Sequence, residues 1–197
     1  MQSPYTKLAA TKWLKKTEAL AANYPLKMDE LVDVVQTSWS SIFKSKIGSK
    51  HFRIGAHLFP KPQIMAFFLH ELIPLELAAR YPGVWRGEEA SADKDVVFVP
   101  DTSYSMEIKA SSHPTQIFGN RSYAQLNGKG KKSKSGYYLA VNFDKVVKNG
   151  ATPKLRRIRF GWLDHEDWLG QAAATGQQAR LSAEVERGKL LVLFEDR

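Results

Sequence analysis

The chain has 197 residues, of which 43% are hydrophobic and 25% are charged, an ordinary composition for a single soluble globular domain. It has no cysteine, which excludes disulfides and zinc–thiolate sites, and no apolar run long enough to span a membrane. Its formal net charge of +9 favours a polyanionic partner. The first residues lack the apolar core of a signal peptide, so we expect a cytoplasmic protein without membrane contact.

The charge is distributed unevenly along the chain. Residues 61–108 hold four Lys/Arg and eight Asp/Glu, whereas residues 109–160 hold twelve Lys/Arg and one acidic residue. Carboxylates of this kind can bind a cation, and the basic stretch that follows them is typical of nucleic-acid binding. The alternative is an unevenly charged surface that serves only solubility.

The first part of the chain is predicted to be helical. Residues 6–23 and 28–44 carry apolar side chains at spacings of three and four, and a glycine-punctuated basic segment, KSKIGSKHFRIG, follows them. A third and more apolar helix is predicted from Gln63 to Arg80, with Pro74 as a point at which it could kink. Tyr81-Pro82-Gly83 is expected to end it.

After the third helix the apolar period changes from helical spacing to two, which indicates strands. Residues 113–125 are polar and irregular, and residues 165–187 are predicted to be helical in parts. The pattern predicts an α/β (α+β) fold with a mixed central β-sheet flanked by helices. No domain boundary is visible, so we expect one domain over 1–197, with a helical N-terminal part (about 1–60) and a core (about 61–197). The predicted strands are 84–86, 95–99, 104–111, 137–143, 155–163 and 190–194.

Residues 104–111, YSMEIKAS, alternate strictly between apolar and polar side chains. A three-residue loop, Pro100–Thr102, would place Asp95 directly opposite Glu107 on one face of a hairpin. Two adjacent carboxylates repel each other unless a positive charge lies between them, and Mg²⁺ fits that need. Lys109, on the same face, could hold the attacking water. A loop one residue longer would move Asp95 to the other face, and a solvated ion pair is the alternative interpretation.

This D-x(11)-E-x-K arrangement resembles the PD-(D/E)XK nuclease superfamily, and its basic continuation strengthens the resemblance. The resemblance implies a restriction-endonuclease-like core and magnesium-dependent hydrolysis of phosphodiesters. Asp95, Glu107 and Lys109 would be the catalytic residues. The metal would be held by Asp95, Glu107 and the backbone carbonyl of Ile108. The superfamily often adds an acid from the preceding helix, which here would be Glu71.

Other acidic residues fit this role less well. Asp101 follows a proline, as in the literal motif, but it falls in the predicted turn. Asp93 would require an implausibly tight loop to reach Glu107. Glu76, Glu88 and Glu89 rank below Glu71 as additional ligands, and an ordinary surface role is the alternative for all of them.

Longer stretches resemble the family of the type II restriction enzyme ScaI. They include FPKPQIMAFFLHELIPLELAARYPGVWRGEE, KDVVFVP, EIKASSHPTQIFGNRSYAQ and IRFGWLDHEDW, and the similarity covers most of residues 25–185. It implies a DNA endonuclease that cuts double-stranded DNA within a short palindromic site and works alongside a cognate DNA methyltransferase. Because two identical active sites cut both strands of a palindrome, we expect a homodimer.

Two groups of residues after the catalytic strand are candidates for DNA contact. Arginine and the side-chain amides can make bidentate contacts with bases, whereas lysines in a Gly/Ser-rich loop suit phosphates. A polar surface loop and a solvated charge run are the alternatives. The candidates for base contact are Gln116, Asn120, Arg121 and Gln125, and those for phosphate contact are Lys129, Lys131, Lys132 and Lys134.

Two other functions fit the same residues. A structure-specific or repair nuclease could be built on the same core. A DNA-binding protein without catalysis would use Glu107 and Lys109 only as an ion pair.

Overall fold

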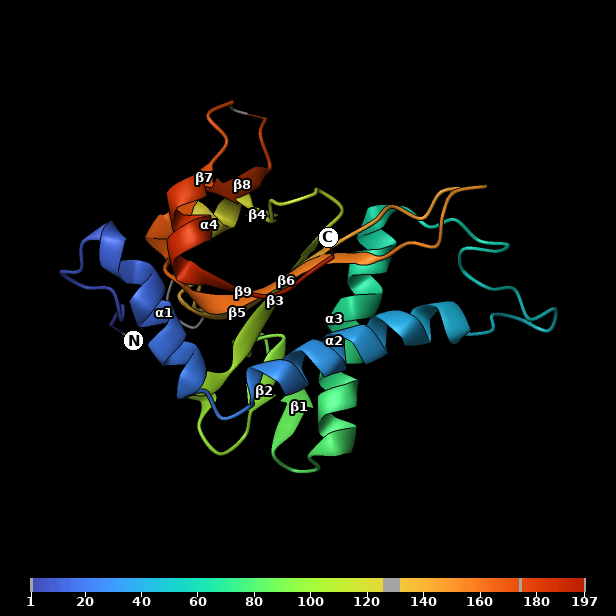
Figure 1. The fold of residues 1–197 in the computed structure, drawn as a ribbon, viewed down its shortest axis with the longest axis horizontal. Coiled ribbons are helices and arrows are strands. Elements are labelled where there is room, and N and C mark those ends of the chain that lie inside the picture. Colours follow the sequence, from blue (N-terminus) through green and yellow to red (C-terminus); the bar gives the residue numbers. More distant parts are fainter. Residues whose placement is uncertain (1, 126–131, 174, 197) are drawn as a thin grey trace.

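The computed structural model describes residues 2–125, 132–173 and 175–196, and a six-stranded mixed sheet lies at its centre (Figure 1). Its strands are β1 (Trp85–Gly87), β2 (Val96–Phe98), β3 (Met106–Ser111), β5 (Gly136–Phe143), β6 (Leu155–Leu163) and β9 (Leu190–Glu195). They lie in the order β1-β2-β3-β5-β6-β9. β3 and β5 are parallel, and the other neighbouring strands are antiparallel. The predicted mixed sheet is confirmed.

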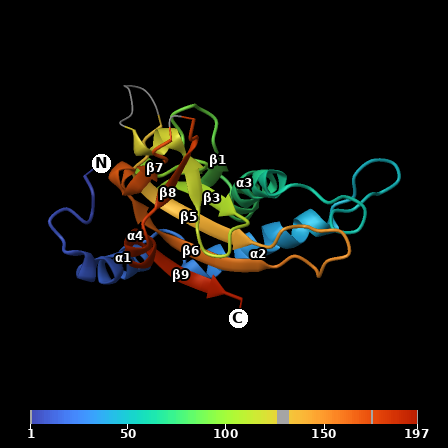
Figure 2. The same cartoon turned by 90° about the horizontal axis from the view of Figure 1, so that it is seen from above.

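Helices cover both faces of this sheet. Those of the described residues are α1 (Trp13–Ala22), α2 (Met28–Lys44), α3 (Pro62–Arg80) and α4 (Ala183–Lys189). α2 buries an apolar stripe at helical spacing, and it packs with α3 in one core beneath the sheet (Figure 2). Both helices match their predicted ranges, and α3 continues through Pro74, whereas α1 is shorter than predicted. Within the described ranges, no helix is long and apolar enough to cross a membrane.

β5 is buried along its whole length because each of its faces meets a separate core. Tyr137, Leu139 and Val141 point into the core that contains α2 and α3. Tyr138 and Ala140 point into a second core on the opposite face. A strand covered on both faces reads as a nearly continuous apolar run, which is the pattern of residues 137–143.

The second core lies beneath a small three-stranded sheet. Its strands are β4 (Phe118–Asn120), β7 (Trp168–Gly170) and β8 (Gln178–Leu181), in the order β4-β8-β7. The prediction that residues 165–187 are helical in parts is confirmed by α4 and the 3-10 turn His165–Asp167, whereas β7 and β8 were not predicted. Strands of three and four residues are too short to display a period.

Two segments project from the same end of the molecule in both views, residues 45–61 and residues 144–154 (Figures 1 and 2). The first has isolated bridges between Ile47 and Phe52 and between Ile54 and Leu58, and Ile54 is buried in the main core. Ile47, Phe52 and Leu58 are exposed although they are apolar. Residues 45–61 therefore present an apolar surface at a distance from the sheet.

Gly161, in the middle of β6, is required by the close approach of the backbone that enters β9. A Cβ atom at this position would lie 1.9 Å from the carbonyl oxygen of Lys189 and 2.9 Å from its carbonyl carbon. These are backbone atoms, so a change of rotamer cannot relieve the clash. Gly170 in β7 differs, because its added Cβ would meet ordinary contacts at 3.5 and 3.7 Å.

We therefore expect Gly161→Ala to lower the free energy of unfolding by about 2 kcal/mol or more, because it forces strands β6 and β9 apart. Gly170→Ala is the matched control and should change the free energy of unfolding by no more than about 0.5 kcal/mol. Urea denaturation of the two variants measures both. If the two variants are equally stable, β9 can move away from β6 without lowering the free energy of unfolding, and the expectation is wrong.

Candidate active site

Asp95 and Glu107 lie opposite each other at the junction of β2 and β3. Val96 pairs with Met106 in antiparallel register, so the next pair outward is Asp95 with Glu107. The loop itself differs from the prediction. A 3-10 turn, Thr102–Tyr104, lengthens it to the seven residues between Phe98 and Met106. Successive side chains of a strand point to opposite faces, so a loop lengthened by an even number of residues leaves each side chain on its face. The loop of seven residues therefore keeps the two carboxylates on the same face, as the predicted loop of three would.

The Asp95 carboxylate is fixed by the strand beside it. Its Oδ2 accepts a hydrogen bond from the backbone N–H of Ile108 at 2.7 Å. The Nδ1 of His70, on α3, lies 3.5 Å from the same oxygen. Burial lowers the pKa of His70, against the opposing effect of Asp95, so the imidazole is neutral at neutral pH. Ile108 and His70 therefore both contact Oδ2 of Asp95, which leaves Oδ1 for other partners.

Glu107 is 3% exposed, so it is not part of a solvated surface ion pair. Its Oε1 accepts hydrogen bonds from the hydroxyl of Tyr123 and from Lys109 Nζ, the latter at 3.1 Å. Burial by itself raises the pKa of Glu107, but Lys109, Lys132 and Lys94 together lower it to about 2. Burial and Glu107 raise the pKa of Tyr123 far above its usual value, so the phenol remains a donor.

Lys132 contacts both carboxylates. Its Nζ lies 2.7 Å from Asp95 Oδ1 and 2.9 Å from Glu107 Oε2. The sequence predicted a phosphate contact on an open loop, whereas the structure places this ammonium, 17% exposed, between two acids. Burial opposes its charge, but Glu107 and Asp95 raise its pKa above the usual value.

Further lysines surround the pair. Lys109 Nζ also donates to the carbonyl oxygen of Ile108 at 3.0 Å, as the predicted position on the face of Glu107 allows. Lys134 Nζ lies 4.3 Å from the centre of the Tyr123 ring. Lys94 Nζ donates to the Ser133 carbonyl oxygen at 2.5 Å, and burial lowers the pKa of Lys94 to about 8. Among the described residues, four lysines thus lie around the Asp95–Glu107 pair, and Lys132 also contacts Glu88 at 3.4 Å.

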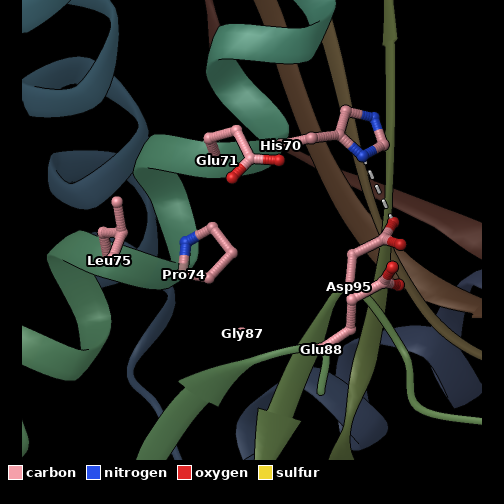
Figure 3. Close-up of a pocket in the computed structure, with 7 residues that line it drawn as sticks. All are labelled: His70, Glu71, Pro74, Leu75, Gly87, Glu88 and Asp95. Carbon is pink, nitrogen blue, oxygen red and sulfur yellow. Dashed lines mark ion pairs between the residues drawn. The ribbon is translucent and has the colours of Figure 1, made fainter. Parts of the chain in front are cut away.

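A pocket of about 450 Å³ opens beside Asp95 (Figure 3). Glu71, on α3, lies across this pocket from Asp95, and Glu88 lies beside Asp95. Glu76 instead pairs with Arg80 on the same helix at 2.8 Å. The residues that line the pocket are His70, Glu71, Pro74, Leu75, Gly87, Glu88 and Asp95.

The oxygen donors of this site suit a magnesium ion. Within the described ranges, no three His, Asp or Glu side chains form a ready-made metal cluster. Glu107 Oε2 is nevertheless buried and accepts no hydrogen bond from the described residues, although Lys132 approaches it at ion-pair distance. Two carboxylates and a backbone carbonyl are hard oxygen donors, and Mg²⁺ keeps several of its waters. Asp95, Glu107 and the Ile108 carbonyl therefore fit the ion that the sequence predicts.

The candidate DNA-contact residues lie on different parts of the surface. Asn120 and Gln125 are exposed and Gln116 is half-buried. The guanidinium of Arg121 donates to the carbonyl oxygens of Ala173 and Gly176 at 3.3 and 3.4 Å. Lys129 and Lys131 lie outside the described residues.

The small sheet adds residues that sequence reasoning missed. Gln178 pairs directly with Asn120, and Arg180 pairs with Phe118 on one side and with Leu169 on the other. Along β8 exposed and buried residues alternate, so Gln178 and Arg180 share the outward face. The alternation of residues 178–181, QARL, was the available signal, but it spans only four residues.

Comparison with known proteins finds similarity over almost the whole chain. Residues 3–194 match the family described as ScaI restriction endonuclease. The chain is 51% identical over 193 residues to a type II restriction enzyme, ScaI, from Streptomyces caespitosus, an alignment that covers 97% of this chain and 84% of the relative. No solved structure matches the chain.

The pKa of Glu107 predicts a pH dependence of stability. The pKa is about 2 in the folded protein, against a usual value of 4.5. Ionised Glu107 therefore contributes stability that is fully present above pH 4.5 and is lost as the pH falls towards 2. The difference in unfolding free energy between the native protein and Glu107→Gln should be constant above this range and shrink within it. Chemical denaturation in a chelating buffer measures it, and a difference independent of pH would contradict the assignment.

Proposed function

The chain belongs to the ScaI restriction endonuclease family, and from this premise we propose that it is a type II restriction endonuclease. It cuts double-stranded DNA within a short palindromic site, depends on Mg²⁺ and acts in the cytoplasm as a homodimer beside a cognate DNA methyltransferase. The observation that carries the proposal is the Asp95–Glu107 pair, opposed across a hairpin and surrounded by lysines. Such a site accepts a divalent cation on its acids and a phosphodiester near its cations.

The chain's own residues divide the chemistry between them. Asp95, Glu107 and the Ile108 carbonyl hold the magnesium ion, which when bound stabilises negative charge on the phosphoryl group. Lys109 lies within hydrogen-bond distance of two of these ligands, so its ammonium can orient the attacking water beside them. Glu71, across the pocket from Asp95, is the further candidate ligand.

DNA contacts extend from this centre over the small sheet. We assign base reading to the outward face that carries Asn120 and Gln178, because side-chain amides make bidentate contacts with adenine. Arg121 has five N–H donors, so it can hold two loop carbonyls and still contact DNA. Arg180, on the same outward face, is a further candidate, as are Gln116 and Gln125. Phosphate contacts are assigned to Lys129, Lys131, Lys132 and Lys134.

The N-terminal part and the core act as one unit in this proposal. Leu31 and Val34 of α2 share a core with Phe143 of β5, which supports the proposal that residues 1–60 and 61–197 belong to a single domain. A homodimer follows from the two-fold symmetry of a palindrome. Residues 45–61, with their exposed apolar side chains, offer the surface through which two copies can associate.

Digestion of a plasmid with and without Mg²⁺, followed by sequencing of the ends, tests the function. Discrete bands support a restriction endonuclease. Smearing, or cutting only at junctions, would support the structure-specific or repair nuclease instead. No cutting in any divalent cation would favour a DNA-binding protein without catalysis.

The same digest tests the catalytic pair. Asp95→Ala and Glu107→Ala should each abolish cleavage, because each removes a carboxylate from the cation site. Asp101→Ala is the matched control: it follows a proline, but its carboxylate only caps the Ser103 N–H in the turn. The control should cut at close to the native rate, with circular dichroism showing that all variants are folded. Substantial cutting by both Asp95→Ala and Glu107→Ala would refute the site assignment.

Base reading by the small sheet predicts a loss of discrimination. Asn120→Ala and Gln178→Ala should each lower the ratio of cognate to scrambled affinity. The corresponding loss in the difference between the two binding free energies is about 1–3 kcal/mol. Ser122→Ala, close by and exposed, should leave this ratio unchanged. Binding is measured with Ca²⁺ in place of Mg²⁺ to limit hydrolysis. If both amide variants weaken binding to cognate and scrambled duplexes equally, these side chains only position the protein.

A further inference from the structure

Two ammonium groups already contact the oxygens to which the proposed function assigns the cation. Lys109 Nζ lies 3.1 Å from Glu107 Oε1 and 3.0 Å from the Ile108 carbonyl oxygen. Lys132 Nζ lies 2.7 Å from Asp95 Oδ1 and 2.9 Å from Glu107 Oε2. Lys132 is therefore the group that bridges the two carboxylates from different strands.

The two lysines are anchored differently. Lys109 belongs to β3 and pairs with Ala140 of β5, so its backbone is fixed within the sheet. Lys132 lies outside the helices and strands, in the stretch that leads into β5. Its ammonium reaches Asp95 across 37 residues of sequence. Lys132 can therefore withdraw without disturbing the sheet, whereas Lys109 cannot.

An ammonium and a divalent cation cannot bridge the same two carboxylates at once. They would compete for the same oxygens, and their like charges would repel each other in a site of low exposure. Without any cation, however, the two acids would repel each other, and a buried unpaired carboxylate is strongly destabilising. The Asp95–Glu107 pair therefore needs a positive partner at every stage.

We propose that Lys132 is a positioning residue that holds Asp95 and Glu107 together in the DNA-free enzyme and competes with the divalent cation for them. This inference rests on the proposed cation-dependent function. When DNA binds, a backbone phosphate gives the Lys132 ammonium another anionic partner and releases the carboxylates. DNA and cation therefore bind with positive coupling, and each raises the affinity for the other by the same factor.

Binding of Mn²⁺ to the DNA-free protein tests the competition directly. The free Mn²⁺ is counted from its electron paramagnetic resonance signal, so no cleavage is needed. Lys132→Met keeps the length of the side chain and removes its charge. This variant should bind Mn²⁺ about 10- to 100-fold more tightly than the native protein, the range expected when a charged hydrogen-bonded partner no longer has to be displaced.

Lys134→Met is the matched control. It removes one charge from the same stretch, but the Lys134 ammonium lies over the Tyr123 ring and has no carboxylate partner among the described contacts. Its Mn²⁺ affinity should rise no more than about threefold, through long-range charge alone. Lys132→Gln serves as a second variant if Lys132→Met does not fold, as judged by circular dichroism.

The coupling is tested by repeating the Mn²⁺ titration with a saturating duplex that lacks the recognition sequence, corrected for Mn²⁺ bound by the duplex alone. DNA should raise the Mn²⁺ affinity of the native protein and of Lys134→Met, but not that of Lys132→Met. An equal rise in all three would overturn the coupling through Lys132.

The outcomes separate the two proposals. If the native protein and Lys132→Met bind Mn²⁺ equally well, or if the variant binds it more weakly, Lys132 does not compete and the inference is wrong, while the cation-dependent function stands. If neither protein binds Mn²⁺ with or without DNA, the cation-dependent function itself fails, and the inference fails with it.

Discussion

The burial of one negative charge, the carboxylate of Glu107, determines the rest of the site. The side chain is 3% exposed, in β3, whose Met106 and Ile108 lie in the larger core. An ionised carboxylate in such a place is tolerated only with close positive partners and hydrogen-bond donors. Lys109, Lys132 and the Tyr123 hydroxyl supply them. The groups that stabilise the folded protein are thus the groups that a phosphodiester would meet.

The same carboxylate links the two parts of the molecule that the proposed function separates. Tyr123 donates to Glu107 and lies in the 3-10 turn that directly follows β4. Asn120, on the outward face of the small sheet, ends that strand. The proposed reading face and the proposed cutting centre are therefore joined through one short turn and one hydrogen bond. A movement of the small sheet on DNA would therefore alter the hydrogen bond from Tyr123 to the Glu107 carboxylate.

Sequence patterns predicted the parts of this structure that depend on local periodicity. α2 and α3 were visible because their apolar stripes run over 17 and 19 residues. Alternation in β3 predicted that Glu107 and Lys109 share a face, whereas opposing Asp95 to Glu107 also required an assumed loop length. The small sheet was missed because its strands are too short for any period. The position of Lys132 was missed because a run of lysines reads as a solvated loop. Its contact with Asp95 spans 37 residues, and no local pattern encodes a contact of that range.

The single parallel pair in the large sheet, β3 with β5, bears on how this family can diversify. Parallel neighbours need a long crossover, and here residues 112–135 supply it, with β4, Tyr123 and Lys132 all within one connection. Lengthening a connection is inexpensive, since each doubling of a loop costs only about 0.6 kcal/mol in closure entropy. Insertions and replacements at the exposed positions of this stretch could therefore alter the proposed target preference while the Asp95–Glu107 hairpin and the larger core, to which the described residues of the stretch contribute no buried side chain, remain as they are. The topology thus separates a connection that can change in length from the sheet that it joins.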